Sequence, residues 1–546
     1  MKVLFTVFCS LFLYTILNAN NIVVTNIKLT CQNTSSQYSL VQFNISWENS
    51  FRVITGPANW DAAWVFVKYR ISVANGGDGV WKHANLGNTG YTAPSGSTIT
   101  PGLLFPGSAY NISTNPVVGV FLYSDAAGTG TFSKTGVQLQ WNYGANGVAD
   151  NALVDIQVFA IEMVYVPQGA YYLGTGGTER GSFTDGAWSG TDAVTPTIPF
   201  LVSSESAVNV AHSAGNLWYS LYWPDWYGDQ AGPIPASFPK GYAAFYCMKY
   251  ELSQQGYVDF LNTLSYTQQI ARSIIAPSSA AGTYLWLYNR FRIKIATAGI
   301  NCSIPAIYAT DFPNVGCNFL NWADMAAYLD WCGLRPMTEL EFEKACRGTA
   351  TAVPNEYAWG TATIAPSLYT LSNCGLNNEG IATNYSTTAG NVTYLGTDPA
   401  GGSIDGPVRV GIFAANPANT GRVTSGATYY GIMEMSGNNW ERPVTVGDPA
   451  GRSFTGLHGD GELNSNGQGN VDYWPGINGN NTRTTPNTVY GGVTGILNTS
   501  AAGSGFRGSD WDCEYRLLQV CDRFDAEYLI TGRCTSCGCR GVRSAP

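Results

Sequence analysis

Cysteine is the residue type with the greatest chemical potential in this chain, and it gathers towards the carboxyl end. Of the thirteen cysteines in 546 residues, five lie in the last stretch of the sequence: Cys513, Cys521, Cys534, Cys537 and Cys539. Sulfurs so placed can form disulfides, bind a metal or act as a redox pair. The last three form the spacing C-x-x-C-x-C, which in a reducing compartment indicates zinc or a redox dithiol. The compartment therefore helps to decide between these interpretations.

The amino terminus indicates which compartment this is. Lys2 is followed by an apolar run at residues 3–17 and by a Leu-Asn-Ala sequence that ends at Ala19, a pattern typical of a cleaved signal peptide. We therefore expect residues 1–19 to be a signal peptide and the protein to be secreted or displayed at the cell surface. Cleavage would remove Cys9 and leave twelve of the thirteen cysteines, an even number that an oxidising compartment can pair completely. Disulfides are thus the favoured interpretation.

The overall composition limits the partners. Charged residues make up 12% of the chain and the formal net charge is −9, without the clustered Lys and Arg that phosphate backbones require, so we expect no nucleic-acid partner. No later stretch is apolar for the roughly 18 residues that a membrane span needs, and we expect none. The low charge and the loops rich in glycine and aromatic residues are compatible with a glycan or protein ligand and with self-association at the cell surface.

Residues 20–160 have the pattern of a β-rich region. Short alternating or β-branched runs, such as residues 40–47 and 117–123, are separated by Gly, Pro, Asn and Ser turns. This pattern predicts a β-sandwich domain of the immunoglobulin or fibronectin kind. Because no cluster of titratable residues occurs here, we expect a spacer that orients the next domain, with an adhesive module as the alternative. The single His83 is expected at the surface or as a cap.

From residue 161 onward, helical signals appear among long loops. Ser253 can cap a helix, apolar residues recur at helical spacing over residues 322–329, and Thr338 with Glu341 forms a capping box. After this third helix the chain is rich in Gly, Asn and Thr. A segment of that length must be ordered by bound ions, disulfides or aromatic packing.

Seven sequence blocks in residues 161–546 resemble one protein family. In chain order they are MVYVPQGAYYLG, FYCMKYELSQQGYVDFLN, LRPMTELEFEKACRG, YAWG, GIMEMSGNNWE, GFRGSDW and GCRGVR. Together they are similar to the formylglycine-generating enzymes, also called sulfatase-modifying factors. The resemblance implies an α+β fold, with an irregular C-type-lectin-like formylglycine-generating-enzyme domain that is poor in regular structure and often binds calcium. It does not extend to residues 20–160.

The resemblance implies an activity only if the reactive residues match. Active members oxidise a substrate cysteine to formylglycine with two cysteines, five residues apart, that hold copper as thiolates, a soft-ligand set suited to Cu(I). Cys513 matches the first of these cysteines. The second falls on Leu518, or on Tyr515 when the blocks are aligned from residues 520–523 instead. Neither alignment recovers the pair, so Cys513 would be catalytic only if the protein is active, and we expect no copper.

The turn before Cys513 departs from the family pattern as well. Ser509 and Asp510 stand where the family shows Gly and then Ser, and Glu514 stands where the enzymes usually carry His. We therefore predict that the other four cysteines of the carboxyl end form structural disulfides. Two alternatives stay open: Cys521 could approach Cys513 across a loop, and the C-x-x-C-x-C run could bind metal or act in redox chemistry.

A second block predicts a different metal. In the sequence GNNWE a turn brings backbone carbonyls close to a carboxylate, the oxygen-rich ligand set that Ca²⁺ takes. The resemblance implies that Gly437 and Asn439 provide carbonyls and that Glu441 provides its carboxylate. We expect a structural calcium ion at these residues. The alternative is that Trp440 fills the core and Glu441 caps a backbone amine.

Other chemistries have less support. The iron-dependent branch of the superfamily requires several histidine ligands, whereas this chain has three in separate contexts, His83, His212 and His458. A G-x-S-x-G nucleophile elbow and a glycine-lysine phosphate loop are both missing. Residues 217–230 gather Trp and Tyr side chains beside two Asp, which suits sugars, although a core role is favoured for most of these rings. The Glu-Pro-Asn or Gln-Pro-Asp tripeptide of C-type lectins does not occur.

Two functions remain. The favoured one is an exported surface or extracellular protein that uses a formylglycine-generating-enzyme-like scaffold for ligand binding or assembly, without oxidase activity. The alternative is a copper-dependent oxidase that generates formylglycine on protein cysteines. The first is favoured because a scaffold can survive the loss of a thiolate, whereas thiolate copper chemistry cannot.

Overall fold

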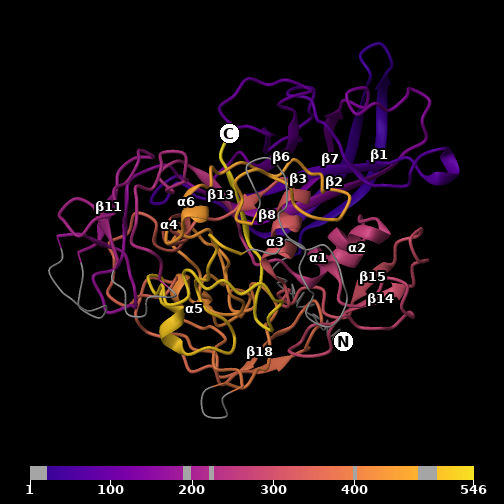
Figure 1. Ribbon diagram of the computed structural model, residues 1–546. Helices are drawn as coiled ribbons and strands as arrows, with labels where there is room; N and C mark the ends of the chain where they lie inside the picture. The colour runs from indigo at the N-terminus through magenta and orange to yellow at the C-terminus, as the bar shows by residue number, and fades with distance from the viewer. Residues whose placement is uncertain (1–20, 188–197, 220–226, 398–401, 477–500) are drawn as a thin grey trace, which may run out of the picture.

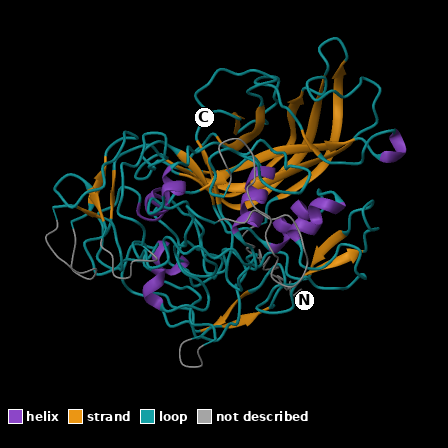
Figure 2. Ribbon diagram, in the orientation of Figure 1, coloured by secondary structure: helices purple, strands orange, loops and turns teal. Residues whose placement is uncertain are grey.

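Strands and loops make up most of the molecule. The computed structural model describes residues 21–187, 198–219, 227–397, 402–476 and 501–546. The predicted signal peptide lies outside these ranges. Within them helices are few and short, and long loops connect the strands (Figure 2). No helix in the described ranges is long and apolar enough to cross a membrane.

One antiparallel sheet combines strands from both ends of the chain (Figure 1). Its spatial order is β16-β19-β13-β8-β3-β6-β5, with β4 paired to β3. These strands are β3 (Asp61–Arg70), β4 (Lys82–His83), β5 (Ser97–Leu103), β6 (Val117–Ser124), β8 (Asp155–Val166), β13 (Phe245–Met248), β16 (Arg335–Pro336) and β19 (Gly541–Ser544). The boundary predicted between residues 160 and 161 falls inside β8, which pairs with β3 on one side and with β13 on the other. The sheet is therefore continuous across that boundary.

A three-stranded sheet packs on the amino-terminal part of this larger sheet. It consists, in the order β1-β2-β7, of β1 (Val23–Asn33), β2 (Tyr38–Arg52) and β7 (Gly128–Trp141). Alternate residues of β2, among them Val41 and Phe43, are buried in one cluster with Val65 of β3 and Leu122 of β6. Two sheet layers thus share a core here, but the larger layer continues into strands from beyond residue 161. A separate sandwich domain stays a prediction.

Strand β3 joins the two main cores because both of its faces are buried. Val65 and Val67 belong to the core under the three-stranded sheet, whereas Trp64 and Phe66 belong to the core that contains the helices. A strand covered on both faces has apolar residues in nearly continuous order rather than in alternation. The sequence of β3, DAAWVFVKYR, has this character.

The helices begin where local capping predicts. They are α1 (Gln254–Leu261), α2 (Tyr266–Arg272), α3 (Trp322–Trp331), α4 (Glu339–Arg347), α5 (Arg422–Ser425) and α6 (Pro449–Arg452). The Ser253 hydroxyl accepts a hydrogen bond from the N–H of Gly256 at 3.2 Å. Thr338 and Glu341 each accept a hydrogen bond from the other's N–H at 3.1 Å, so the predicted capping box is confirmed.

Small strand pairs and single helical turns order the loops. They are β9 (Tyr171–Leu173) with β11 (Phe200–Val202), β10 (Thr184–Asp185) with β12 (Leu217–Trp218), β14 (Ile293–Thr297) with β15 (Ile307–Thr310), β17 (Thr370–Ser372) with β18 (Gly380–Thr383), and the 3₁₀ turns η1 (Val73–Asn75) and η2 (Tyr515–Leu518). Stacked or tilted rings pack between these elements, for example Trp286 on Phe319, whose centroids are 4.6 Å apart. Aromatic packing is therefore one of the forces that order the loops, as expected.

The cysteines are mostly unpaired, which contradicts the expected complete pairing. In the described part of the chain, Cys534 and Cys537 form a disulfide, with Cα atoms 5.2 Å apart, and ten other cysteines are free. Six of the free thiols are buried in the core. There the thiol packs as a small apolar group; for example, Cys332 lies within hydrogen-bond distance of the carbonyl of Leu329 at 3.5 Å. Only part of the carboxyl-terminal cluster forms a disulfide.

Buried ion pairs fasten helix α4 to the carboxyl-terminal loops. The Glu339 carboxylate accepts hydrogen bonds from Arg507 at 3.0 Å and from Arg523 at 2.7 and 3.0 Å. One turn later, Glu343 binds the same Arg507 at 2.7 Å. Burial alone would raise the pKa of Glu339, but Arg523 and Arg507 more than offset this and hold it below its usual value. A carboxylate in this network is therefore ionised at neutral pH and needs both arginines.

Replacement of Arg523 by alanine tests the importance of this network. Because Arg523→Ala leaves Glu339 buried with half of its positive partners, we expect the free energy of unfolding to fall by about 3–5 kcal/mol. The matched control is Arg70→Ala, which breaks the exposed pair with Asp155 and should cost at most about 1 kcal/mol. Urea unfolding followed by tryptophan fluorescence measures both. Equal losses in the two variants would contradict the assigned role.

Candidate functional site

Cys513 lies on a loop that Asp510 shapes. The Asp510 carboxylate accepts hydrogen bonds from the backbone N–H groups of Asp512 and Cys513 at 2.9 and 2.8 Å, which closes a tight turn directly before the thiol. The carbonyl of Cys513 in turn accepts a hydrogen bond from the N–H of Leu395 at 3.1 Å. Ser509, where the family pattern shows Gly, has a φ of 64°, a left-handed conformation that glycine adopts without strain. Ser509 thus has the backbone conformation for which glycine, the residue of the family pattern at this position, is the least strained choice.

The surroundings of the Cys513 thiol oppose its ionisation. The residue is partly buried, and burial raises the pKa of the thiol, with a further contribution from the adjacent Asp510 carboxylate and a smaller one from Asp525. A reactive or metal-binding cysteine needs the opposite, a positively charged neighbourhood that lowers the pKa of the thiol. Cys513 is therefore a protonated thiol at neutral pH.

Neither candidate partner position brings a second sulfur to Cys513. Leu518 is completely buried in a cluster with Tyr357 and Trp359, and Tyr515 is 42% exposed on the 3₁₀ turn η2. Burial thus explains the apolar residue at position 518, whereas Tyr515 lies at the surface. The predicted site residues do lie on one loop, but they provide one thiol rather than two.

Cys521 has partners of its own. Its sulfur lies 2.8 Å from Nη2 of Arg347 and 3.1 Å from Oε2 of Glu343, inside the buried network of α4. It is free and is not joined to Cys513. The prediction of four structural disulfide cysteines is therefore right for Cys534 and Cys537 and wrong for Cys521 and Cys539, which are buried thiols.

The residues predicted to bind calcium lie on one turn, where protein groups bind the Glu441 carboxylate and the N–H groups of Gly437 and Asn439. The Glu441 carboxylate forms a buried ion pair with Arg540, with Oε1 and Nε 2.5 Å apart. The backbone N–H and the side-chain amide of Asn439 donate to Glu251 at 2.9 and 2.8 Å. Gly437 donates its N–H to a backbone carbonyl of the facing loop at 2.8 Å.

Arg540 places a positive charge beside Glu441, at the position where the resemblance implies a calcium ion. Burial alone would lower the pKa of Arg540, but Glu441 and other neighbouring groups more than offset this, so the pKa is raised. The buried Oδ1 of Asn439 has no hydrogen-bond partner and could face a cation, but the carboxylate is taken. Calcium bound through Glu441 does not fit unless the ion displaces Arg540. Calcium at these residues stays a prediction.

Comparison with protein families decides the relationship of the chain. The model of the sulfatase-modifying factor enzyme 1-like domain matches residues 157–446, which is more than half of the sequence. The chain belongs to this family. A comparison with curated proteins finds no match. The matched range begins inside β8 and contains α4 and the turn with Glu441, whereas Cys513 lies beyond it.

The three histidines lie in separate places in the described chain. His83 is 3% exposed and its Nε2 lies 2.6 Å from a carbonyl of β6, so the expected surface position is wrong. His458 is also buried and accepts a hydrogen bond from the last N–H of β19 at 3.0 Å. Burial lowers the pKa of both His83 and His458 well below the usual value. His212 instead stacks on Trp218, and nowhere in the described ranges do three or more His, Cys, Asp or Glu side chains form a group that could hold a metal.

The aromatic stretch at residues 217–230 is core where the structure describes it. Tyr219 and Tyr227 are completely buried, which confirms the favoured interpretation for these rings. Residues 220–226 lie outside the described ranges. Asp229, one of the two Asp expected beside a sugar, forms an ion pair with Arg452 at 2.7 Å. The described part of this stretch thus has a structural role in the family domain.

Sequence reasoning missed the acidic surroundings of Cys513. Asp525 is nearly buried, and burial raises its pKa to about 7, with Asp522 as the next cause. Asp522 pairs with Arg180, with Oδ2 and Nε 3.1 Å apart, and so ties this segment to a loop more than three hundred residues earlier. The only available signal was the frequency of Asp residues on both sides of Cys513.

Alkylation tests the electrostatic state of Cys513. Since Asp510 raises the pKa of the thiol, Asp510→Asn should increase the rate of carbamidomethylation of Cys513 by iodoacetamide at pH 8 by about tenfold, while the amide oxygen keeps the turn. Asp512→Asn is the matched control and should leave the rate unchanged. Peptide mass spectrometry resolves the modified site. Faster labelling of Cys513 in the unaltered protein than of the exposed Cys31 would contradict the prediction.

Thermal unfolding tests whether Arg540 or a calcium ion is the partner of the Glu441 carboxylate. Because Arg540 already neutralises this carboxylate, we expect the same Tm in calcium chloride and in EDTA. Glu441→Gln should lower the free energy of unfolding by about 3 kcal/mol in both solutions, since it leaves Arg540 buried and unpaired. A calcium-dependent rise in Tm of several degrees that disappears in Glu441→Gln would show instead that the ion displaces Arg540.

Proposed function

We propose that this protein is an exported, non-catalytic member of the sulfatase-modifying factor family, which uses the family scaffold for ligand binding or assembly at the cell surface. The observation that carries the proposal is the environment of Cys513. This thiol has carboxylates rather than cations around it, and the position of its expected partner is the buried Leu518.

The chemistry of copper supports the absence of oxidase activity. Cu(I) in a two-cysteine site is bound by thiolates, so both thiols must lose their protons when the metal binds. Burial and then Asp510 raise the pKa of Cys513 and make that loss unfavourable. With one thiol at the site, copper would also lack its second sulfur ligand.

The copper-dependent oxidase remains the alternative through Cys521. That sulfur would have to leave Arg347 and Glu343, which hold it at 2.8 and 3.1 Å. Burial raises the pKa of Cys521 well above its usual value, with Arg347 acting in the opposite direction. The alternative therefore needs a rearrangement of the most highly connected part of the core.

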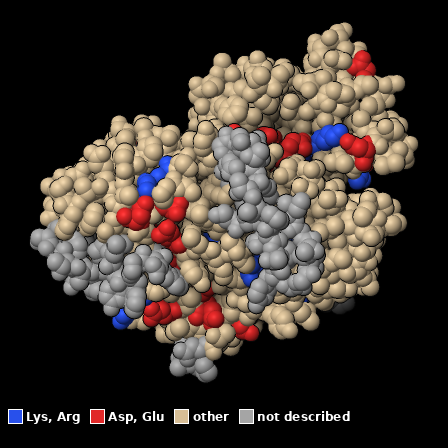
Figure 3. Space-filling model, in the orientation of Figure 1, with Lys and Arg blue, Asp and Glu red and all other residues tan. Residues whose placement is uncertain are grey.

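The surface suits a neutral partner better than a polyanion. On the face seen in Figure 3 most of the described surface is uncharged, and the acidic and basic side chains gather in a few small patches. Such a surface supports contacts with a glycan, with a protein or with a second copy of the chain. These partners are part of the proposal.

Export rests on the signal-peptide pattern of residues 1–19. The disulfide between Cys534 and Cys537 agrees with an oxidising compartment. The ten free cysteines of the described chain add no further support. The location at the cell surface is therefore argued mainly from the sequence.

A measurement of copper binding distinguishes the non-catalytic scaffold from the copper-dependent oxidase. A variant with the exposed Cys31, Cys302 and Cys374 replaced by serine avoids non-specific thiol binding. In this background we expect no stoichiometric Cu(I) binding in competition with a chromogenic chelator, and no aldehyde on a cysteine-containing sulfatase-motif peptide in the presence of oxygen. The control adds Cys513→Ser. Tight copper binding that Cys513→Ser abolishes, or peptide conversion that it abolishes, would overturn the proposal.

A further inference from the structure

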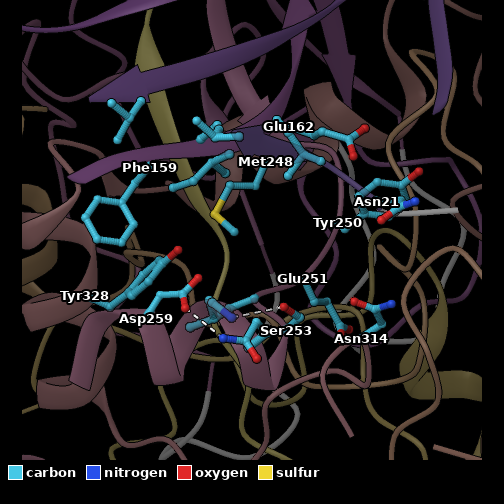
Figure 4. Close-up of a pocket in the computed structure, with 18 of the residues that line it drawn as sticks. Asn21, Phe159, Glu162, Met248, Tyr250, Glu251, Ser253, Asp259, Asn314 and Tyr328 are labelled. Carbon is cyan, nitrogen blue, oxygen red and sulfur yellow. Dashed lines mark hydrogen bonds between the residues drawn. The ribbon is translucent and has the colours of Figure 1, made fainter. Parts of the chain in front are cut away.

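A pocket of about 430 Å³ lies where the amino-terminal strands meet the family domain. Strand β1 forms one wall through Val24 and Ile27, together with Ile22 directly before it, and β8 provides a second wall. The segment from the end of β13 into helix α1 completes the pocket (Figure 4). We call it the β1–α1 pocket. Its volume is that of a small-molecule site, and such sites are common at junctions between domains.

The ionisable groups of the β1–α1 pocket are all acidic. Glu162 of β8, Glu251 of the loop before α1, and Asp259 of α1 line it, and none of the described residues that line it is Lys, Arg or His. The remaining lining is mainly apolar or aromatic, with Phe159 and Tyr328 at one end in Figure 4. The pocket therefore combines apolar surface with carboxyl groups whose pKa burial raises, and at pH 8 Glu162, with a pKa of about 7, is mostly ionised.

Glu162 has an oxygen without a partner. The residue is 4% exposed, and its Oε2 lies 3.2 Å from Nζ of Lys249, which also binds Asp61 at 3.0 Å. Its other oxygen, Oε1, is buried and has no hydrogen-bond partner in the described chain. An unsatisfied buried acceptor costs about 1–3 kcal/mol, and a carboxylate oxygen costs more. Because Oε1 has no exposed surface in the pocket, a ligand donor would remove that cost after a small rotation of the Glu162 side chain.

The other two carboxylates differ from Glu162. Glu251 accepts three hydrogen bonds from Asn438 and Asn439 at 2.7–2.9 Å and needs no ligand, and burial, with Glu441 as the next cause, raises its pKa well above the usual value, so it is not a source of negative charge. Asp259 accepts one from Gln255 at 2.7 Å. In Figure 4 Glu162 and Asp259 lie on opposite sides of the pocket. A ligand that donates a hydrogen bond to Glu162 would therefore gain more binding free energy than one that contacts either of the other two.

We propose that the β1–α1 pocket binds a small organic cation, with a primary ammonium group that donates to Oε1 of Glu162 and an apolar body that packs against Met248, Phe159 and Tyr328. The ammonium supplies the missing donor and balances the charge of Glu162. Aromatic rings stabilise a nearby cation as well as an apolar chain. The site is independent of Cys513, so it can be present whether or not the protein is an oxidase.

Calorimetric titration of the full-length secreted protein at pH 8 tests the proposal. The probe is phenethylamine, and 2-phenylethanol is its neutral counterpart of the same size. We expect binding of the amine and at least about tenfold weaker binding of the alcohol, which lacks the charge. Equal affinities of the two compounds would overturn the proposal.

Two variants locate the binding. Glu162→Gln should weaken phenethylamine binding by about tenfold, whereas Asp155→Asn, on the same strand but outside the pocket, should not change it. Because Glu162→Gln also disturbs Lys249, Val24→Trp provides a second variant that fills the pocket from β1 without removing a charge, and it should abolish binding. Unchanged affinity in either pocket variant would overturn the assignment.

The pH profile gives an independent readout. Burial raises the pKa of Glu162 to about 7, and the charged groups that face it are Lys249, Asp61 and Glu48. About nine tenths of such a carboxylate is ionised at pH 8 and about one tenth at pH 6, so affinity should fall by about tenfold between them. Glu162→Gln should flatten this profile. A profile that is identical in the variant would contradict a role for Glu162.

Discussion

The buried carboxylate of Glu339 is the interaction on which most of this structure depends. It stands at the first position of α4, and Arg507 and Arg523 reach it from loops more than 160 residues later. A charge taken out of water is tolerable only when all of its partners are present, and removal of one partner costs several kcal/mol. The carboxyl-terminal loops are long and almost without regular structure. Because few backbone hydrogen bonds between strands hold them, these ion pairs keep them in place. They fix the loops against a helix that the capping box has already placed.

This use of arginine and glutamate also determines what the cysteines can do. Arg347 and Glu343 hold Cys521, and Arg540 holds Glu441, so the positive charges of the interior serve the fold. None of the groups that shift the pKa of Cys513 most is a cation; its main neighbours are Asp510 and Asp525. A thiol becomes a good ligand or nucleophile through cations. The arginines of the interior thus stabilise the fold, and none of them is among the main groups that shift the pKa of Cys513.

Local rules predicted some elements and failed for others, for physical reasons. The caps at Ser253 and Thr338 were predictable because donor and acceptor lie three residues apart. The pairing of Glu339 with Arg507 has no sequence period, so nothing in the sequence pointed to it. The pairing of Glu441 with Arg540 is of the same kind, since the motif around Glu441 could not reveal a partner about a hundred residues later, and calcium there stays a prediction. The even number of cysteines left after signal-peptide cleavage suggested complete pairing. That number does not show which thiols are buried in separate parts of the core.

The shared sheet changes the expected role of the amino-terminal region. A spacer would contact the next domain through a small interface, yet β3 and β8 lie in the middle of a sheet that β13 and β19 continue. Both cores depend on β3, because its two faces are buried in different clusters. The β1–α1 pocket has one wall from each region, so any group bound in it contacts both. Its binding free energy would then add to the stability of the junction by mass action. The amino-terminal strands thus share a core with the helices of the family domain and form one wall of the β1–α1 pocket.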